Sequence, residues 1–341
     1  MSKYNHELLQ PCKNNWQSVL AQAVREPQEL LQLLKLTEHP LAQQVCIDKQ
    51  FPLLVPRTFV QRMRSGNADD PLLRQVLSVA DEQLSVQGYT QDPLDEQASN
   101  VSPGLIHKYH GRVLLIAASG CAVNCRYCFR RHFPYADNRV GRQQWHSALN
   151  YVAQDSSISE VILSGGDPLL LGDEQLSELL EQIAAIAHVK RLRIHSRLPV
   201  VIPQRLTAEL MQLLSQSRLR TSLVLHINHA QELAPEHLGL LAQYRAAGIT
   251  LLNQTVLLKG VNDDEQTLCQ LSETLFDYGV LPYYLHQLDR VQGAQHFALS
   301  AERTQELYRH MQQYLPGYLV PKLVCEQAGQ PHKTLIPIGI I

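Results

Sequence analysis

The sequence lacks a charge imbalance, a long apolar run and a dense set of cysteines, and each absence excludes a class of protein. The 341 residues carry 30 Lys and Arg against 32 Asp and Glu, a formal net charge of −2, so no strong field favours nucleic acid or an anionic membrane. No apolar run approaches the roughly 18 residues of a membrane span, and residues 1–16 are polar where a secretory signal is apolar. The sequence therefore predicts a soluble, cytoplasmic protein that binds neither nucleic acid nor membrane.

Seven cysteines are too few, in a chain of this length, for a secreted protein held together by disulfides. Three of them, Cys121, Cys125 and Cys128, fall within eight residues. We interpret the scattered ones as small, partly buried side chains: Cys12, Cys46, Cys269 and Cys325. The cluster needs a chemical explanation of its own.

The sequence pattern divides the chain into three parts. Residues 1–105 read as short amphipathic helices separated by prolines, and their last stretch, 92–105, is rich in Pro, Gly, Ser and Asp, which predicts a linker or a strap across the next domain. Residues 106–290 alternate apolar runs with amphipathic segments. Residues 291–341 offer a helix, a short apolar segment and a Gly- and Pro-containing stretch, AGQPHKTLIP.

The middle part predicts a parallel sheet covered by helices. The expected strands are 113–117, 161–164, 192–195, 223–227, 250–256 and 282–286. The expected helices are 143–153, 173–186, 208–214, 235–247 and 265–278, with one more at 301–314 in the last part. Such βα repeats fit an open doubly wound sheet or a curled barrel. A full eight-stranded barrel needs about 250 residues and only about 175 are spanned here, so we expect an incomplete (β/α)6 TIM-like barrel with chemistry at the carboxyl ends of its strands.

The three clustered cysteines directly follow the first expected barrel strand, in ASGCAVNCRYCFRRHF. Thiolates spaced Cys-x3-Cys-x2-Cys can hold three irons of a [4Fe–4S] cluster and leave the fourth iron without a protein ligand. A structural zinc needs a fourth ligand, which His132 could supply, and three unrelated buried cysteines are the third interpretation.

The segment CAVNCRYCF resembles the signature of the radical S-adenosylmethionine (radical SAM) superfamily. The resemblance implies that S-adenosyl-L-methionine binds the open iron and that its reductive cleavage yields a radical that removes hydrogen from a substrate. In SGGDP, Gly165, Gly166 and Asp167 match a cofactor-binding turn in which missing side chains let the backbone approach the cofactor. The alternative is a plain tight turn before the next helix.

Much of the chain further resembles the lysine 2,3-aminomutase family. The matching stretches are DPLDEQASNVSPGLIHKYHGRVLL, CAVNCRYCFRRHF, LSGGDPL, LRIHSRLPVVIPQR, LLNQTVLLKGVND, PYYLHQLDRVQGAQHF and GQPHKT. The family also binds pyridoxal 5′-phosphate, and Lys333 matches the lysine that holds it covalently. Arg112 matches the arginine on the phosphate of this cofactor, and the resemblance places Tyr109 against the same group.

The resemblance also implies the substrate site. Arg130 matches the arginine that binds the substrate carboxylate, and Asp289 and Glu326 match two acids that hold a side-chain ammonium. Glu326 replaces the aspartate of the usual pattern. Exposed, solvated side chains are the alternative for each position. Two carboxylates at one end of a cavity favour an amino acid that ends in ammonium, so lysine is the expected substrate.

The implied activity is that of an isomerase, an intramolecular aminotransferase that converts L-α-lysine to (R)-β-lysine. The chain ends eight residues after Lys333, whereas catabolic members continue, so it resembles the short branch that supplies β-lysine for modification of elongation factor P. The implied partners are that factor, its lysyl-transferring ligase and a flavodoxin- or ferredoxin-like electron donor. The alternatives are a catabolic lysine aminomutase and a non-catalytic iron-sulfur or zinc protein that binds a partner through its N-terminal helices.

Several polar residues fall at the ends of expected strands. They are His195, Ser196, Arg197, Asn253 and Gln254, with His226 and His229 nearby. Contact with a cofactor and a packing or capping role are equally compatible with such positions.

Overall fold

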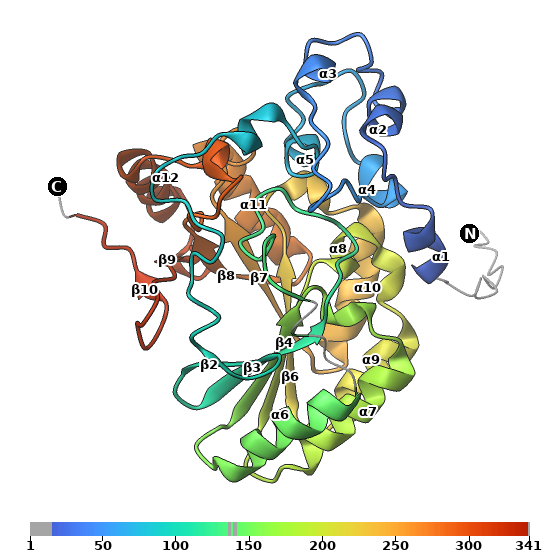
Figure 1. Cartoon of the computed structure of the whole chain (residues 1–341), viewed down its shortest axis with the longest axis vertical. Coiled ribbons are helices and arrows are strands. Elements are labelled where there is room, and N and C mark those ends of the chain that lie inside the picture. The colour runs from blue at the N-terminus through green and yellow to red at the C-terminus, as the bar shows by residue number, and fades with distance from the viewer. Residues whose placement is uncertain (1–15, 136–137, 139–141, 340–341) are drawn as a thin grey trace, which may run out of the picture.

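The computed structural model describes residues 16–135, 138 and 142–339, and its centre is the predicted parallel sheet (Figure 1). All six predicted strands are confirmed, most of them a residue or two longer than expected. They are β3 (Arg112–Ala118), β4 (Glu160–Gly165), β5 (Arg191–Ser196), β6 (Arg220–His226), β7 (Thr250–Val256) and β8 (Leu281–His286). Buried positions such as Val113, Leu163 and Ile194 explain why these apolar runs form strands covered on their outer side.

The sheet extends beyond the six predicted strands. β9 (Lys322–Cys325), from the C-terminal part, pairs in parallel with β8, so this part continues the barrel. Antiparallel strands lie outside the parallel set, with β1 (Asn100–Ser102) and β2 (Leu105–Tyr109) next to β3, and β10 (Thr334–Leu335) next to β9. The spatial order is therefore the sequence order, β1 to β10, as expected for a partial barrel of βα repeats.

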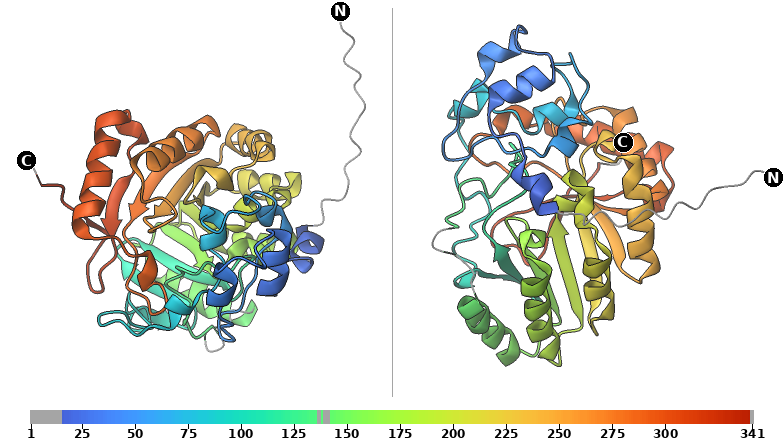
Figure 2. Two further views of the ribbon diagram at one scale, coloured as in Figure 1. Left: turned by 90° about the horizontal axis from the view of Figure 1, so that it is seen from above. Right: turned by 90° about the vertical axis from the view of Figure 1, so that its right-hand side faces the viewer.

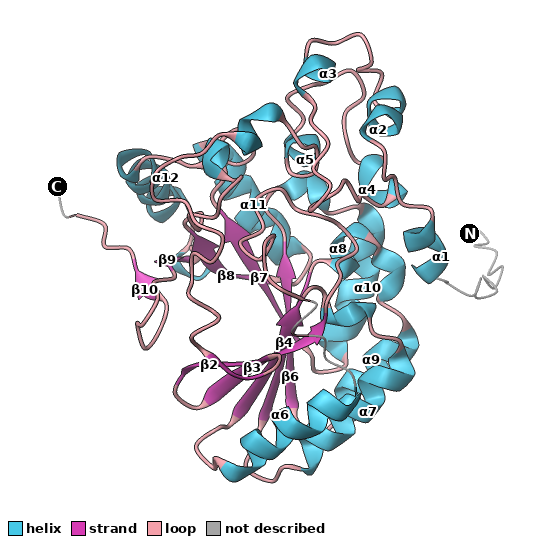
Figure 3. Cartoon of the chain, in the orientation of Figure 1, coloured by secondary structure: helices cyan, strands magenta, loops and turns pink. Residues whose placement is uncertain are grey.

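The predicted helices lie along the outside of the strands (Figure 3). They are α6 (Arg142–Gln154), α7 (Asp173–Ala185), α9 (Ala208–Gln216), α10 (Pro235–Ala246), α11 (Glu265–Asp277) and α12 (Ala301–Tyr314), and the short α8 (Leu198–Val201) follows β5. Side-chain caps fix several starts: Thr207 accepts from the backbone N–H of Leu210, and Ser300 accepts from that of Arg303. The predicted helices are thus confirmed to within a few residues.

Residues 16–83 form an N-terminal unit of short helices, as predicted from the prolines that separate its amphipathic segments. They are α1 (Trp16–Ala21), α2 (Pro27–Leu33), α3 (Leu41–Gln44), α4 (Arg57–Val60), α5 (Pro71–Arg74) and the 3-10 helix η1 (Ala80–Gln83). Pro27 and Pro71 each occupy a first helical position, where a missing N–H costs nothing. Side chains of this unit and of the barrel share one hydrophobic core, so the unit is packed onto the barrel at one end of the strands (Figure 2).

Five more 3-10 helices occupy connecting segments. They are η2 (Pro168–Leu170), η3 (Pro203–Arg205), η4 (Ala230–Glu232), η5 (Gln295–Phe297) and η6 (Gly317–Leu319). A second apolar cluster joins α11, α12, β8 and β9. Within the described ranges, no helix combines the length and apolarity that crossing a membrane requires.

Candidate active site

A cavity of about 450 Å³ lies inside the barrel, and every site residue predicted from the sequence lines it. It extends from Arg112, the first residue of β3, to the cysteine loop that follows the last residue of β3. The remaining walls come from β4 to β8, from the β9–β10 hairpin, and from Glu96 and Lys108 before β3. Residues far apart in the sequence therefore meet in one space.

The cysteine loop brings Cys121, Cys125 and Cys128 to the same cavity wall. Burial raises the pKa of the Cys128 thiol to about 11 and that of Cys121 well above its usual range, and the neighbouring cysteine sulfurs add to both shifts. Thiols in this state become ligands only when a metal displaces their protons. A cubane cluster takes each cysteine on a different iron, and the three cysteines line one cavity. The donor set thus fits a [4Fe–4S] cluster.

The zinc interpretation has no support from His132. The Nε2 atom of this residue lies 3.1 Å from the carbonyl oxygen of Gln292, outside the cavity that the three cysteines line. Among the scattered cysteines, Cys46, Cys269 and Cys325 are partly buried as expected, and Cys12 lies outside the described residues.

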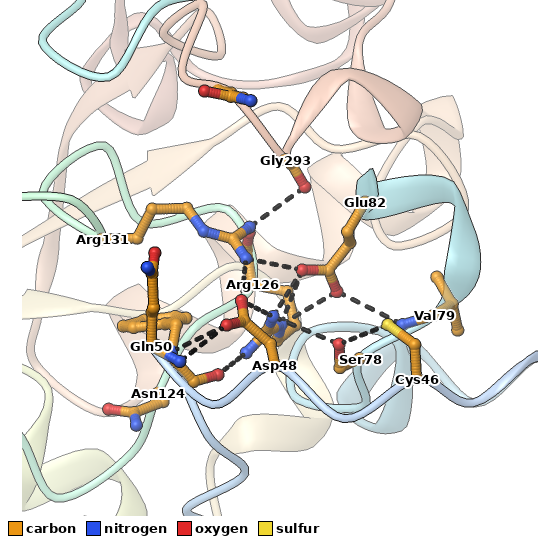
Figure 4. A network of polar contacts seen from close by, with 12 residues as sticks. Cys46, Asp48, Gln50, Ser78, Val79, Glu82, Asn124, Arg126, Arg131 and Gly293 are labelled. Atoms are coloured by element: carbon orange, nitrogen blue, oxygen red, sulfur yellow. Dashed lines mark hydrogen bonds and ion pairs between the residues drawn. The ribbon is translucent and has the colours of Figure 1, made fainter. Parts of the chain in front are cut away.

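The N-terminal unit holds the cysteine loop from outside (Figure 4). Arg126 lies between Cys125 and Cys128 in the sequence and is fully buried. It donates through Nε to both carboxylate oxygens of Glu82, at 2.9 and 3.0 Å. Arg131 donates to the same carboxylate at 2.8 Å and to Asp48 at 3.0 Å. We call Glu82, Asp48, Arg126 and Arg131 the loop clamp. The clamp fixes the segment that carries the cluster ligands.

The two glycines of SGGDP are explained by close packing, Gly165 against β3 and Gly166 against the start of the cysteine loop. Gly165 has a φ of +115°, and a Cβ there would lie 2.6 Å from Cγ2 of Ile116. A Cβ on Gly166 would lie 2.0 Å from the carbonyl oxygen of Gly120. The space that we expected a cofactor to use is thus filled by β3 at Gly165 and by loop backbone at Gly166, and cofactor contact by these glycines stays a prediction.

Asp167 ties the ends of β4 and β5 together. Its carboxylate accepts from the Ser196 hydroxyl at 2.6 Å and from the backbone N–H groups of Arg197 and Leu198, both at 2.8 Å, besides that of Leu169. These four donors engage both carboxylate oxygens. The observed role of Asp167 is therefore to position the turn after β5, and its predicted role in binding a cofactor is untested.

Alternating charges run along one wall of the cavity. Arg130 donates through Nε and Nη2 to both oxygens of Glu96, at 2.6 and 2.7 Å. Lys108 lies 3.6 Å from Glu96 and 3.1 Å from Glu326, which is also paired with Lys333. Neither Glu96 nor Lys108 was predicted as a site residue from the sequence, although both fall in stretches that resemble the family. We call these five residues the charged row.

The two predicted acids carry opposite pKa shifts. Burial would raise the pKa of Glu326, but the ammonium groups of Lys333 and Lys108 outweigh it and lower the pKa to about 2. Burial, together with the charge of Glu326, raises the pKa of Asp289 to about 7. One acid is thus permanently charged, whereas the other gains or loses its proton near neutral pH.

The β9–β10 hairpin places Lys333. Cys325 and Thr334 are paired in the antiparallel ladder, so Glu326 and Lys333 are the next residues along the two arms. The Lys333 side chain is mostly buried, and its Nζ lies 6.0 Å from the centre of the Tyr284 ring. The predicted cofactor lysine is thus inside the cavity, held by an ion pair with Glu326.

Arg112 and Tyr109 lie near the amino end of β3. The guanidinium carbon of Arg112 lies 4.6 Å from the centre of the Tyr109 ring. Burial, and next the charge of Glu326, raises the pKa of Tyr109, so its hydroxyl stays protonated. Arg112 makes no ion pair with another described residue, so it is available to an anionic group such as a phosphate.

Three histidines add uncharged donors and acceptors to the cavity: His195, His226 and His286. Burial lowers the pKa of all three, that of His226 to about 3. The Nε2 atoms of His195 and His286 are buried and lack a hydrogen-bond partner within the described ranges, which is typical of atoms that contact a bound ligand. Gln254 also lines the cavity, and its side-chain nitrogen lies 2.7 Å from Nε2 of His226.

The other strand-end candidates have structural roles. Asn253 accepts from the backbone N–H of Ile227 and donates to its carbonyl oxygen, which joins β6 to β7. Ser196 bonds Asp167, and His229 accepts from the backbone N–H of Gln231 at the start of η4. These residues confirm the capping interpretation.

Comparison with known proteins decides the family. Residues 115–271 match the Radical SAM superfamily. The chain is 52% identical to the L-lysine 2,3-aminomutase of Escherichia coli strain K12 over 331 residues, which cover 97% of this chain and 96% of that protein. The chain belongs to the lysine 2,3-aminomutase family. The same family includes the L-lysine 2,3-aminomutase of Haemophilus influenzae, 48% identical over 95% of this chain and 96% of that protein. The enzyme of Clostridium subterminale is 32% identical over 94% of this chain and 77% of that protein.

Family membership confirms the predicted superfamily and the class of enzyme, an isomerase. It also implies the cofactors: radical SAM proteins carry a [4Fe–4S] cluster and S-adenosyl-L-methionine, and lysine 2,3-aminomutases use pyridoxal phosphate. We call Cys121, Cys125 and Cys128 the cysteine wall. This wall fits these groups, as do Arg112 and the Nε2 atoms of His195 and His286, which lack an ion pair or hydrogen bond to another described residue.

Proposed function

We propose that this protein is a radical SAM, pyridoxal phosphate-dependent lysine 2,3-aminomutase that converts L-α-lysine to (R)-β-lysine. The observation that carries the proposal is the shared cavity, in which the cysteine wall faces the same space as the charged row. The reaction needs a radical source and an amine-binding site within reach of one substrate, and this arrangement provides both.

When bound, the cluster and S-adenosyl-L-methionine supply a hydrogen-abstracting radical, and pyridoxal phosphate supplies the conjugated ring through which the amino group moves. Cys121, Cys125 and Cys128 would hold the cluster. Lys333 would hold pyridoxal phosphate through its amine, Arg112 would bind the phosphate of that cofactor, and burial in the barrel would exclude water from all of them.

The charged row selects the substrate. Arg130 has five N–H groups, of which Glu96 takes two and Ser164 one, so two remain for the carboxylate of an amino acid. Glu326 and Asp289 offer carboxylates to an ammonium elsewhere in the cavity. An amino acid whose side chain ends in carboxylate would be repelled there.

The ion pair between Lys333 and Glu326 supports lysine as the substrate. Nζ of Lys333 is itself the end of a lysine side chain, and it contacts Glu326 in the present structure. A substrate ammonium that takes its place restores the ion pair when the amine of Lys333 is committed to a cofactor. Without such an ammonium, the mostly buried carboxylate of Glu326 would keep Lys108 but lose its second cationic partner, so the site favours a substrate that carries this group.

An anaerobic assay tests the reaction. Purified protein is given L-lysine, dithionite, S-adenosyl-L-methionine and pyridoxal phosphate, and β-lysine is measured by mass spectrometry after chiral separation. Lys333→Ala should lose both β-lysine formation and the borohydride-sensitive pyridoxal absorption band. Lys322→Ala, which changes an exposed lysine on β9, is the matched control and should keep both. Retention of the band and of activity in Lys333→Ala would refute the cofactor assignment.

We further propose that the product serves the modification of elongation factor P. The support is the resemblance to the short branch of the family: the match covers 96% of the Escherichia coli and Haemophilus influenzae proteins but 77% of the clostridial enzyme. Deletion of the gene should remove the β-lysyl mass increment from elongation factor P, and added (R)-β-lysine should restore it. An unchanged mass of that factor, together with loss of growth on lysine, would instead indicate a catabolic role.

A further inference from the structure

Arg197 links the cysteine loop to residues that the proposed reaction does not use. It directly follows β5, and only 5% of its surface is exposed. Its Nη1 donates to the sulfur of Cys125 at 2.7 Å and also contacts the hydroxyl of Tyr127. The guanidinium therefore lies against one of the three sulfurs that would ligate the cluster.

The other side of the guanidinium is held by buried acceptors. Nη2 donates to Gln75 Oε1 at 2.7 Å and to Glu232 Oε2 at 2.9 Å, and Gln75 donates in turn to Glu232 at 3.1 Å. Gln75, which directly follows α5, and Glu232, in η4, are completely buried. Such a network fixes the position of the guanidinium.

The backbone of Arg197 is fixed as well. Asp167 accepts its N–H at 2.8 Å, so the turn after β5 is tied to the end of β4. Gln75 also reaches the cysteine loop directly, since its carbonyl oxygen accepts the N–H of Arg126 at 2.9 Å. Arg197 and the cysteine loop are thus positioned by the same residue of the N-terminal unit.

We propose that Arg197 is a positioning residue that raises the reduction potential of the cluster through its hydrogen bond to Cys125. The proposal rests on the proposed function, because it requires the [4Fe–4S] cluster on these cysteines. Reduction adds one electron from an external donor to the cluster, and Arg197 gives up no proton. A fixed positive charge and an N–H donor at the ligand sulfur both stabilise the more negative, reduced state.

Substrate or phosphate binding is a weaker explanation for this side chain. Both terminal nitrogens of Arg197 already have partners among the described residues, whereas Arg112 has no anionic partner there. The remaining Nε is buried without a partner and offers one more donor beside the cysteine loop. The contacts therefore assign Arg197 to the cluster.

A redox titration of anaerobically reconstituted holoprotein, followed by electron paramagnetic resonance of the reduced cluster, tests the proposal. Arg197→Met should lower the ratio of reduced to oxidised cluster at a fixed potential at least tenfold, a shift of about 59 mV for one electron. Arg197→Lys, which keeps the charge but not the planar fork, should show a smaller decrease. Arg205→Met removes another buried guanidinium, one that bonds the carbonyl oxygens of Leu169 and Leu171, and should leave the potential unchanged.

Iron and sulfide content is measured on each variant, so loss of the cluster is separated from a shift in its potential. If Arg197→Met does not retain the cluster, the potential of the Arg197→Lys variant tests the proposal in its place. Potentials equal to that of the unaltered protein in the cluster-loaded Arg197 variants would overturn the proposal. Neither lysine nor pyridoxal phosphate is present in the titration, so a failure to form β-lysine leaves this result intact. Absence of any cluster in the unaltered protein would instead refute the proposed function.

Discussion

Glu326 and Asp289 show how two acids in one cavity acquire different tasks. Glu326 lies between the ammonium groups of Lys108 and Lys333, which keep it charged despite burial. Asp289 makes no ion pair with a described residue, so burial dominates its pKa. A substrate ammonium would supply the missing partner. Its binding should then depend on whether the Asp289 carboxyl group is deprotonated.

We therefore expect lysine binding to weaken as the pH falls through about 7. Below that value Asp289 is protonated and neutral, while the lysine side chain, with a pKa of about 10.4, remains charged. At lower pH, kcat/KM for lysine should fall by up to tenfold for each pH unit. Asp289→Asn should remove this dependence and raise KM at pH 8, whereas Asp277→Asn, exposed at the end of α11, should behave as the unaltered protein. A dependence that survives in Asp289→Asn would contradict this assignment.

Among the elements, the loop clamp should contribute strongly to stability. Glu82 is nearly inaccessible to solvent and forms ion pairs with both Arg126 and Arg131. Its removal therefore takes a carboxylate partner away from two buried guanidinium groups. Glu82→Ala should lower the free energy of unfolding by about 3 kcal/mol and reduce the iron content after reconstitution. Denaturant titration and iron analysis measure the two effects.

An ion pair in the same N-terminal unit provides the comparison. Glu29 and Arg57 form a pair that is about 40% exposed, so Glu29→Ala should cost less than about 1 kcal/mol and leave the iron content unchanged. Equal losses in the two variants would mean that the clamp has no special relation to the cysteine loop.

The strap also contributes to the site through Glu96, which orients Arg130. Glu96→Gln keeps the shape of the side chain but removes the charge of the bidentate pair, so the guanidinium should lose its fixed orientation. We expect KM for lysine to rise about tenfold with a smaller change in kcat, because the contact serves binding in the ground state and transition state alike. Asp95→Asn changes the exposed neighbour, whose φ of 48° asparagine tolerates, and should have little effect. A change confined to kcat would speak against an orienting role.

The sequence could predict elements and residues whose signal is local. Hydrophobic periodicity located the barrel strands and their helices, and α12 has the predicted bounds. β9 and β10 were missed because such short strands are defined by their pairing with distant segments. Glu96 and Lys108 were missed for the same reason, since their partners Arg130 and Glu326 lie 34 and 218 residues away. The motif identified the ligands, but the contacts that orient them follow from the fold.

At the scale of the whole molecule, the cysteine loop joins the N-terminal unit to the barrel. Backbone N–H groups of Asn124 and Arg126 donate to carbonyl oxygens of Leu54 and Gln75, at 3.1 and 2.9 Å, while the cysteines between and beside them face the cavity. Cysteines that are held in place by a bound cluster should therefore stabilise both the cysteine loop and the part of the N-terminal unit that it contacts. α12 belongs to the second apolar cluster and lies outside this connection.

Removal of the cluster by an iron chelator should thus loosen the N-terminal unit as well as the loop. Hydrogen exchange followed by mass spectrometry should show faster exchange in peptides covering 51–83 and 119–131, because the amides that join them lose their fixed partners. Peptides covering 301–314 should exchange at the same rate with and without the cluster, since α12 packs against α11 and β9. Unaltered exchange of residues 51–83 would show that the N-terminal unit is stabilised by the barrel alone, and uniformly faster exchange would show that the cluster stabilises the whole fold.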